Sequence, residues 1–433
     1  MVRSIPGCRS TWRARCSAGL AVLALAGCAS TTPAPAASWP PADTAAPPAQ
    51  ATAAAVDGPS EQRFAEWIGR FRDTARDAGI SEVTLGLAFD GVHFLPRVVE
   101  LDRSQPELNR TVWDYLDTAV SPARVALGLQ RLQQVRTDAD TAAARYVVSP
   151  FVLAAIWGIE SNYGSHYGDI PTIDALATLG FEGRREQWAS GQLLAALQIL
   201  QRGDIDRARM IGSWAGAMGQ TQFLPSVYLA HAVDADGDGR RDLWGSMADV
   251  SASTANFLAH SGWQAGQPWG VEVALPAGFD VGRAADAVRL PSAQWAAEGV
   301  RSIDGTPLPG LSDASVLLPA GARGPAFLTG ANFRVILRYN NSTSYALAVG
   351  LLAQRLAGGP AVQAPWPREL AGLTRGQVQA LQASLNQRGF ASGPADGLLG
   401  PATRDGIRLY QRSLGWPADG YPTLELLQSL QAP

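Results

Sequence analysis

The stretch AAIWGIESNYGS, residues 154–165, places a carboxylate at the end of an otherwise apolar helical run. Ser149 and Pro150 precede it and are residue types favoured at the N-cap and first turn of a helix. Ile156 and Glu160 then share one helical face, because residues four apart lie side by side. The sequence therefore predicts a helix that carries Glu160 on an apolar face near its C-terminal end.

Such an environment has a predictable effect on the Glu160 carboxyl group. Burial disfavours the charged form and raises a carboxyl pKa, and a Glu raised toward neutrality donates a proton near neutral pH. The alternative is a Glu at the surface, hydrogen-bonded to the SNYGS turn that follows. This stretch alone leaves both interpretations open.

A second stretch, GSWAGAMGQTQFLPSVY at residues 212–228, is rich in small residues and carries amides but no charge. Small residues permit close approach of the backbone to a ligand. Neutral amides and hydroxyls suit an uncharged, hydroxyl-rich substrate. A tightly packed contact between helices is the alternative, because small residues serve that purpose too.

Other features limit the function classes. The formal net charge is −3, which excludes the basic field that nucleic-acid binding requires. The four histidines show no zinc spacing and have no cysteine partners. A peptidase or amidase that uses zinc or a Cys/His pair is therefore disfavoured.

The sequence of the N-terminal 59 residues is not typical of a folded domain. Residues 1–27 combine arginines with a short apolar run, as in a signal peptide, and end in LAGC at Cys28. This resembles a bacterial lipobox, which implies lipidation of Cys28 and, since Ala29 follows, anchoring to the periplasmic face of the outer membrane. An ordinary signal peptide with a chance cysteine is the alternative. The Ala/Pro/Thr-rich residues 28–59 are expected to form a tether.

The body, residues 60–357, reads as mainly helical. Residues 61–79 show a 3.6-residue apolar period. Residues 266–332 lose that period, gain Gly and Pro, and contain short strand-like runs. We therefore expect a mainly α fold with a small β subdomain at about 266–332.

Three motifs in order, IWGIESNYG (156–164), GSWAGAMGQTQFLPSVY and RYNNSTSYALAV (338–349), resemble the lytic murein transglycosylase B family, glycoside hydrolase family 103. The resemblance implies a lysozyme-like helical domain. It also implies cleavage, without water, of the β-1,4 bond between N-acetylmuramic acid and N-acetylglucosamine in peptidoglycan, leaving 1,6-anhydromuramyl ends. Glu160 matches the family's single catalytic acid and base. The matching substrate-binding positions are Ser213, Gln222, Tyr115, Tyr339, Asn340 and Tyr345.

Most glycosidases pair the catalytic acid with a second carboxylate. Asp169 and Asp174 come after Glu160 in the sequence, but no pattern identifies either as that second carboxylate. A transglycosylase needs none, because the muramyl C6 hydroxyl attacks within the same molecule. One departure from the family is Phe257, where a Tyr is expected. Two alternatives stay open: a lysozyme-like muramidase that admits water, and a non-catalytic cell-wall-binding lipoprotein.

DADGDGRRDLWG, residues 234–245, has the front half of an EF-hand loop. An acidic turn without an ion is the alternative. No organic cofactor and no catalytic metal are expected. In the resembling family a later Asp completes the loop, so the residues expected to hold a structural Ca²⁺ are Asp234, Asp236, Asp238, Arg240 through its carbonyl, and Asp249.

The C-terminal region divides into a linker at 358–369 and a unit at 370–431 that resembles the PG_binding_1-type peptidoglycan-binding domain, a small three-helix module. Leu381, Leu385, Ile407 and Tyr410 are core positions by spacing. A generic helical cap is the alternative. A second wall-binding module would raise the effective concentration of the enzyme on an insoluble polymer. The expected partners are thus peptidoglycan strands and, through Cys28, a lipid bilayer; any cell-wall synthesis or hydrolysis partners are unknown.

Overall fold

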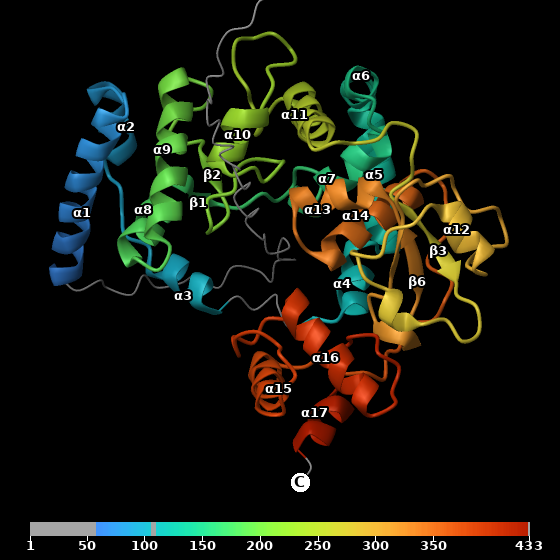
Figure 1. Ribbon diagram of the computed structural model, residues 1–433. Coiled ribbons are helices and arrows are strands. Elements are labelled where there is room, and N and C mark those ends of the chain that lie inside the picture. The colour runs from blue at the N-terminus through green and yellow to red at the C-terminus, as the bar shows by residue number, and fades with distance from the viewer. Residues whose placement is uncertain (1–57, 105–109, 432–433) are drawn as a thin grey trace, which may run out of the picture. The chain divides into compact units, whose positions relative to one another are not determined.

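The computed structural model describes residues 58–104 and 110–431 (Figure 1). The predicted signal peptide, the tether and Cys28 lie outside these residues. In the described part of the chain, no single helix is long and apolar enough to cross a membrane. The helices Arg136–Tyr146 and Pro150–Ser161 reach that length together, but as a pair bent by 117°.

The N-terminal helices form because their apolar residues recur with the helical period. Trp67 and Phe71 lie one turn apart in α1, and their rings stack at 5.3 Å. Pro122 occupies the first turn of α5, and Ser121 caps it by accepting a hydrogen bond from the Arg124 amide. The bounds are α1 Gly58–Asp77, α2 Glu82–Phe89, α3 Pro96–Ser104, α4 Val112–Ala119, α5 Pro122–Gln134 and α6 Arg136–Tyr146.

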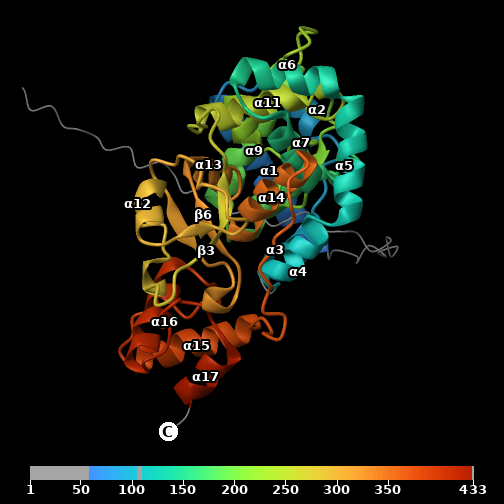
Figure 2. The ribbon, with the colours of Figure 1, turned by 90° about the vertical axis from the view of Figure 1, so that its right-hand side faces the viewer.

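Helix α7, Pro150–Ser161, is the central helix of this body and is buried from Val152 to Ser161. It packs against α5, α6, α11 and α14, as Figure 2 shows. The predicted start holds, since Ser149 caps the helix and Pro150 opens it. The remaining helices of the body are α8 Thr172–Glu182, α9 Glu186–Arg202, α10 Pro225–His231, α11 Met247–His260, α13 Ala331–Tyr339 and α14 Thr343–Leu356.

Two short antiparallel sheets accompany the helices. In the first, β1 (Ile170–Pro171) pairs with β2 (Ile211–Gly212) and fixes the start of the second motif beside the chain that leaves α7. The second has the strand order β4-β3-β6-β5 and its own core around the fully buried Trp295. Its elements are β3 Gly270–Ala274, β4 Arg301–Ser302, β5 Ser315–Leu317 and β6 Ala326–Thr329, with α12 Ser292–Ala297 and the short 3₁₀ turns Val281–Arg283 and Gly321–Arg323.

The C-terminal module consists of α15 (Arg375–Gln387), α16 (Pro401–Ser413) and α17 (Leu424–Gln431) around a separate core. The predicted core positions are confirmed: Leu381, Leu385, Ile407 and Tyr410 are all buried. The buried Gln382 amide also bonds to the 396–398 turn and to α16. These bonds join the turn to two helices of the module.

Candidate active site

Helix α7 ends one residue after Glu160 in a tightly bonded turn. Asn162 and Tyr163 have left-handed backbones, with φ of 47° and 59°, which is uncommon for residues other than glycine. Ser161 Oγ donates to the Trp157 carbonyl. Glu160 itself is only 3% exposed, so the alternative of a surface carboxylate does not hold.

Tyr345 on α14 is a hydrogen-bond partner of Glu160. Its hydroxyl donates to Glu160 Oε1 at 2.6 Å. Burial raises the pKa of Glu160 to about 8, and the hydrogen bond from Tyr345, which favours the charged form, offsets part of that rise. The negative C-terminal end of α7 also disfavours an ionised carboxylate at this position. Glu160 is therefore largely protonated at neutral pH.

Two further tyrosines surround the carboxyl group. The rings of Tyr339 and Tyr345 lie parallel, with centroids 6.3 Å apart, and the Tyr339 hydroxyl donates to the Thr221 carbonyl at 2.7 Å. Tyr115 is buried on α4. Burial and then the charge of nearby Glu160 raise the pKa of both Tyr115 and Tyr339. Three helices thus bring all three predicted tyrosines to Glu160.

Asn340 is buried directly after α13, beside Tyr339. Phe257, the departure from the family pattern, is also buried. Its ring meets that of Tyr339 edge-on at 4.9 Å and that of Phe223 at 5.9 Å. The aromatic surface expected at this position is therefore present without a hydroxyl.

The second motif forms a loop that folds back on itself close to the chain leaving α7. A Cβ at Gly168 would lie 2.1 Å from the Gly212 carbonyl oxygen, and one at Gly212 would lie 1.7 Å from the Ala217 carbonyl oxygen. Only glycine permits such approaches. Ser213 is half-buried in this loop, and its Oγ accepts hydrogen bonds from the amides of Ala215 and Ala217. These two bonds leave the Ser213 hydroxyl proton for another acceptor.

The two glutamines of this loop have different roles. Gln222 has a left-handed backbone, with φ of 50°, and its Nε2 donates to the carbonyls of Tyr167 and Gly219. Gln220, which no motif assigned to a role, is buried; its Oε1 accepts from Trp157 Nε1 at 2.7 Å. Gln220 therefore ties the loop to α7 one turn before Glu160.

Neither acidic residue that follows α7 in sequence forms a pair with Glu160. Asp174 accepts a hydrogen bond from the His93 amide and forms an ion pair with Arg207 at 2.5 Å. Asp169 is exposed. Among the described residues, the causes of the Glu160 pKa shift are burial and Tyr345, and no second carboxylate contributes. This arrangement resembles a single acid rather than a carboxylate pair.

The acidic loop brings three carboxylates together. Oxygen atoms of Asp234, Asp236 and Asp249 lie within 4.8 Å of one another. Asp249 is fully buried, and its two oxygens accept the amides of Ala235 and Asp242, each at 2.7 Å. Burial raises the pKa of Asp249 to about 6. Oxygen ligands of this kind suit a hard cation such as Ca²⁺.

Two predicted metal residues stand apart from that group. Asp238 Oδ1 accepts the Arg240 amide at 2.8 Å, and both residues are exposed. Ser246, which the loop pattern did not mark, donates from its Oγ to Asp236 Oδ2. The group of three carboxylates therefore contains Asp234, Asp236 and Asp249 of the five predicted residues.

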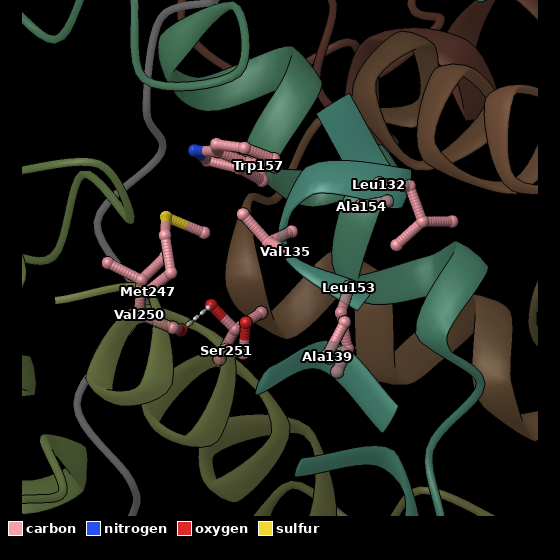
Figure 3. Close-up of a pocket in the computed structure, with 10 residues that line it drawn as sticks. Leu132, Val135, Ala139, Leu153, Ala154, Trp157, Met247, Val250 and Ser251 are labelled. Carbon is pink, nitrogen blue, oxygen red and sulfur yellow. Dashed lines mark hydrogen bonds between the residues drawn. The ribbon is translucent and has the colours of Figure 1, made fainter. Parts of the chain in front are cut away.

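Trp157 and nine other residues line a small, mostly apolar cavity (Figure 3). Because its lining carries no charged group and does not include Glu160, it is not the catalytic site. The lining comes from the α5–α6 region, α7 and α11 and comprises Leu132, Val135, Ala139, Leu153, Ala154, Trp157, Met247, Val250, Ser251 and Thr254.

Comparisons with known proteins agree with this geometry. Residues 63–354 match the Transglycosylase SLT domain family, and residues 374–430 match a peptidoglycan binding domain family. The chain is 34% identical over 250 residues to membrane-bound lytic murein transglycosylase B of Escherichia coli K12, a match that covers 56% of this chain and 66% of that protein.

Two solved structures are also similar. SltB3 from Pseudomonas aeruginosa, in complex with NAG-anhNAM-pentapeptide, is 53% identical with a TM-score of 0.83, covering 85% of this chain and 99% of that one. The Escherichia coli lytic transglycosylase Slt35, in complex with calcium, is 31% identical with a TM-score of 0.58, covering 69% and 93% of the two chains.

Proposed function

Because the chain belongs to the transglycosylase SLT domain family, we propose that it is a lytic transglycosylase that cleaves peptidoglycan between N-acetylmuramic acid and N-acetylglucosamine. The observation that carries this proposal is the burial of Glu160, which raises its pKa to about 8 beside a single tyrosine donor. A carboxyl group that stays protonated near neutral pH is suited to general acid catalysis.

In the proposed reaction Glu160 acts twice. Its proton passes to the glycosidic oxygen, the bond from that oxygen to the muramyl C1 breaks, and the N-acetylglucosamine hydroxyl leaves. The Glu160 carboxylate, stabilised by Tyr345, then takes the proton of the muramyl C6 hydroxyl as that oxygen bonds to C1. The proton is returned, no water is consumed, and a 1,6-anhydro end results. Proximity within one sugar replaces a positioned water.

Polar residues of the second motif and of the third motif would position the glycan. Ser213 has a hydroxyl proton to donate, Gln222 is half-buried in the same loop, and Tyr339 is half-buried beside Asn340. We assign these four residues and Tyr115 to substrate binding. Tyr345 donates its hydroxyl hydrogen bond to Glu160 and is only 1% exposed. Its contribution to binding would therefore pass through the Glu160 carboxylate.

The C-terminal module would hold the enzyme on its polymer. The family match over residues 374–430 supports peptidoglycan binding by this part of the chain. The relative from Escherichia coli is membrane-bound, and we extend this to a lipid anchor on Cys28 at the periplasmic face of the outer membrane. Metabolic labelling with a clickable fatty acid tests the anchor, since Cys28→Ala should abolish labelling.

A structural Ca²⁺ would be held by the acidic loop. The fit rests on the convergence of Asp234, Asp236 and Asp249, with Asp238 and the Arg240 carbonyl as the further ligands expected from the EF-hand pattern. When bound, the ion would neutralise the carboxylates and join the loop to the start of α11. It takes no part in the proposed chemistry.

The experiment that tests this function is mass spectrometry of the muropeptides that the full-length protein, purified in detergent, releases from sacculi. Products one water lighter than lysozyme products are expected. Products with reducing ends would instead support a muramidase. Binding to sacculi without release would support the non-catalytic wall-binding alternative.

A further inference from the structure

The segment that joins the catalytic body to the C-terminal module lies against that body. We call residues 360–370 the strap. Its Val362, Trp366 and Leu370 are partly buried and pack against the main core. Glu272 on β3 accepts the Gln363 and Ala364 amides with its two carboxylate oxygens, at 2.9 and 2.7 Å. A stretch predicted as a linker is thus fixed at several points.

The far end of the strap contacts α4. The Trp366 ring lies 6.3 Å from that of Trp113. The Arg368 guanidinium donates two hydrogen bonds to Asp117, at 2.7 and 2.9 Å, one to each carboxylate oxygen. Such a two-pronged contact fixes orientation as well as distance. The strap therefore holds α4 at residues one turn apart.

The same short helix carries Tyr115 toward the catalytic carboxyl group. Tyr115 is buried, and the charge of Glu160 acts on its phenol. Helix α4 also packs against α14, which brings Tyr345 to Glu160. With eight residues, α4 is too short to be stable by itself, because helices of this length depend on tertiary packing.

We propose that the strap is a positioning element of the active site: Trp366 and Arg368 hold Trp113 and Asp117, and thereby keep Tyr115 and α4 closed over Glu160. The inference rests on the proposed function and deepens it. It assigns the segment before the C-terminal module a role in chemistry that is separate from wall binding.

Loosening α4 would change the surroundings of Glu160 in a defined way. The groups that face it are Tyr115 from α4, Tyr339 from α13 and Tyr345 from α14, while Arg124 on α5 acts on Tyr115. If the α4 wall opens, water reaches Glu160 and its charged form becomes less costly. The basic limb of the pH–rate profile should then move to lower pH, and water should compete with the C6 hydroxyl.

The test uses the full-length protein in detergent and a soluble GlcNAc–MurNAc tetrasaccharide without stem peptides, so that wall binding gives no advantage. We expect kcat to fall about threefold in Asp117→Ala and Arg368→Ala and about tenfold in Trp366→Ala, with a smaller change in KM. The basic limb should shift downward, and the share of reducing-end product should rise.

Two controls separate positioning from general damage. The swap Asp117→Arg/Arg368→Asp should recover most of the lost kcat, because it rebuilds the pair. Asp140→Ala breaks a similarly exposed ion pair with Arg136 on α6 and should leave kcat and the pH limb unchanged. Folding of each variant is checked by its melting temperature.

The outcomes distinguish the two proposals. A native protein that releases no 1,6-anhydro product from either sacculi or the tetrasaccharide overturns the proposed function. A native protein that does so, with strap variants that match it in kcat, pH limb and product ratio, overturns the strap alone. Failure of the charge swap to recover activity, in a folded variant, also counts against positioning.

Discussion

The Tyr345 hydroxyl lies 2.6 Å from Glu160 Oε1, although 185 positions of sequence separate the two residues. The contact moderates the effect of burial on the carboxyl group. Burial alone keeps Glu160 protonated, whereas the phenol stabilises the carboxylate that remains once the proton has left. A group that must act as acid and then as base benefits from both influences.

Removing the phenol should therefore raise the Glu160 pKa further. In Tyr345→Phe the charged form loses a hydrogen bond, which is worth about 1.5–3 kcal/mol when one partner is charged. We expect the basic limb of the pH–kcat profile to move up by about one to two pH units, with a lower kcat because the carboxylate is a less stable product of proton transfer. The pH profile on a soluble glycan measures both effects. An unmoved limb would show that the hydrogen bond does not tune Glu160.

Replacing the acid itself should separate chemistry from binding. Glu160→Gln keeps the shape of the side chain but cannot transfer a proton, so muropeptide release should fall at least about 10²–10⁴-fold. Sedimentation with sacculi should be unchanged, because the C-terminal module is intact. Substantial residual release would contradict the assigned role of Glu160.

The same substitution should alter the pH dependence of stability. Glu160 has a folded-state pKa of about 8 against an ordinary value of 4.5, so the folded protein binds more protons than the unfolded chain between those values. The free energy of unfolding of the protein therefore decreases as pH rises, by roughly 3 kcal/mol between pH 4.5 and 7. Urea unfolding should show that Glu160→Gln gains stability over the native protein as pH increases. Parallel pH curves for the two proteins would contradict this expectation.

Calcium should stabilise the folded protein through the acidic loop. Saturating Ca²⁺, at about 100 times Kd, would add about 2.7 kcal/mol, and chelation should remove it. The gain should be larger at pH 7.5 than at pH 5, because burial raises the pKa of Asp249 to about 6 and the cation binds its ionised form. Thermal melts with and without chelator measure this. Asp249→Asn should show no response to Ca²⁺, while the control Asp140→Ala should respond like the native protein.

The left-handed backbone of Gln222 allows the cost of backbone strain to be measured separately from the loss of the side-chain contact with glycan. Its φ of 50° costs a residue with a Cβ about 1–2 kcal/mol, a cost that glycine avoids. Both Gln222→Ala and Gln222→Gly lose the amide that we assign to glycan binding, so both should lose activity. Gln222→Gly should nevertheless be about 1 kcal/mol more stable than Gln222→Ala in urea unfolding. Equal stabilities would show that the loop relaxes around the substitution.

Local pattern predicted much of this protein. The mostly helical fold with a small antiparallel sheet and the transglycosylase family are confirmed, as are the start of α7 at Pro150 and the core of the C-terminal module. These features follow from period, capping residues and composition, which act over a few neighbouring positions. Local pattern does not predict the break between α5 and α6 at Val135, because no glycine or proline marks it.

The assembly around Glu160 depended on the tertiary structure. The sequence by itself determined that one carboxylate ends an apolar helix and that tyrosines and amides occur in two distant motifs. Only the tertiary packing decided that Tyr345 on α14 bonds to Glu160 on α7, with α4 and α13 packed against α14. It also decided that Gln220 ties the second motif to Trp157 and that the strap lies on α4. Contacts between residues far apart in sequence are set by how whole faces of helices fit together, and local periodicity does not specify that fit.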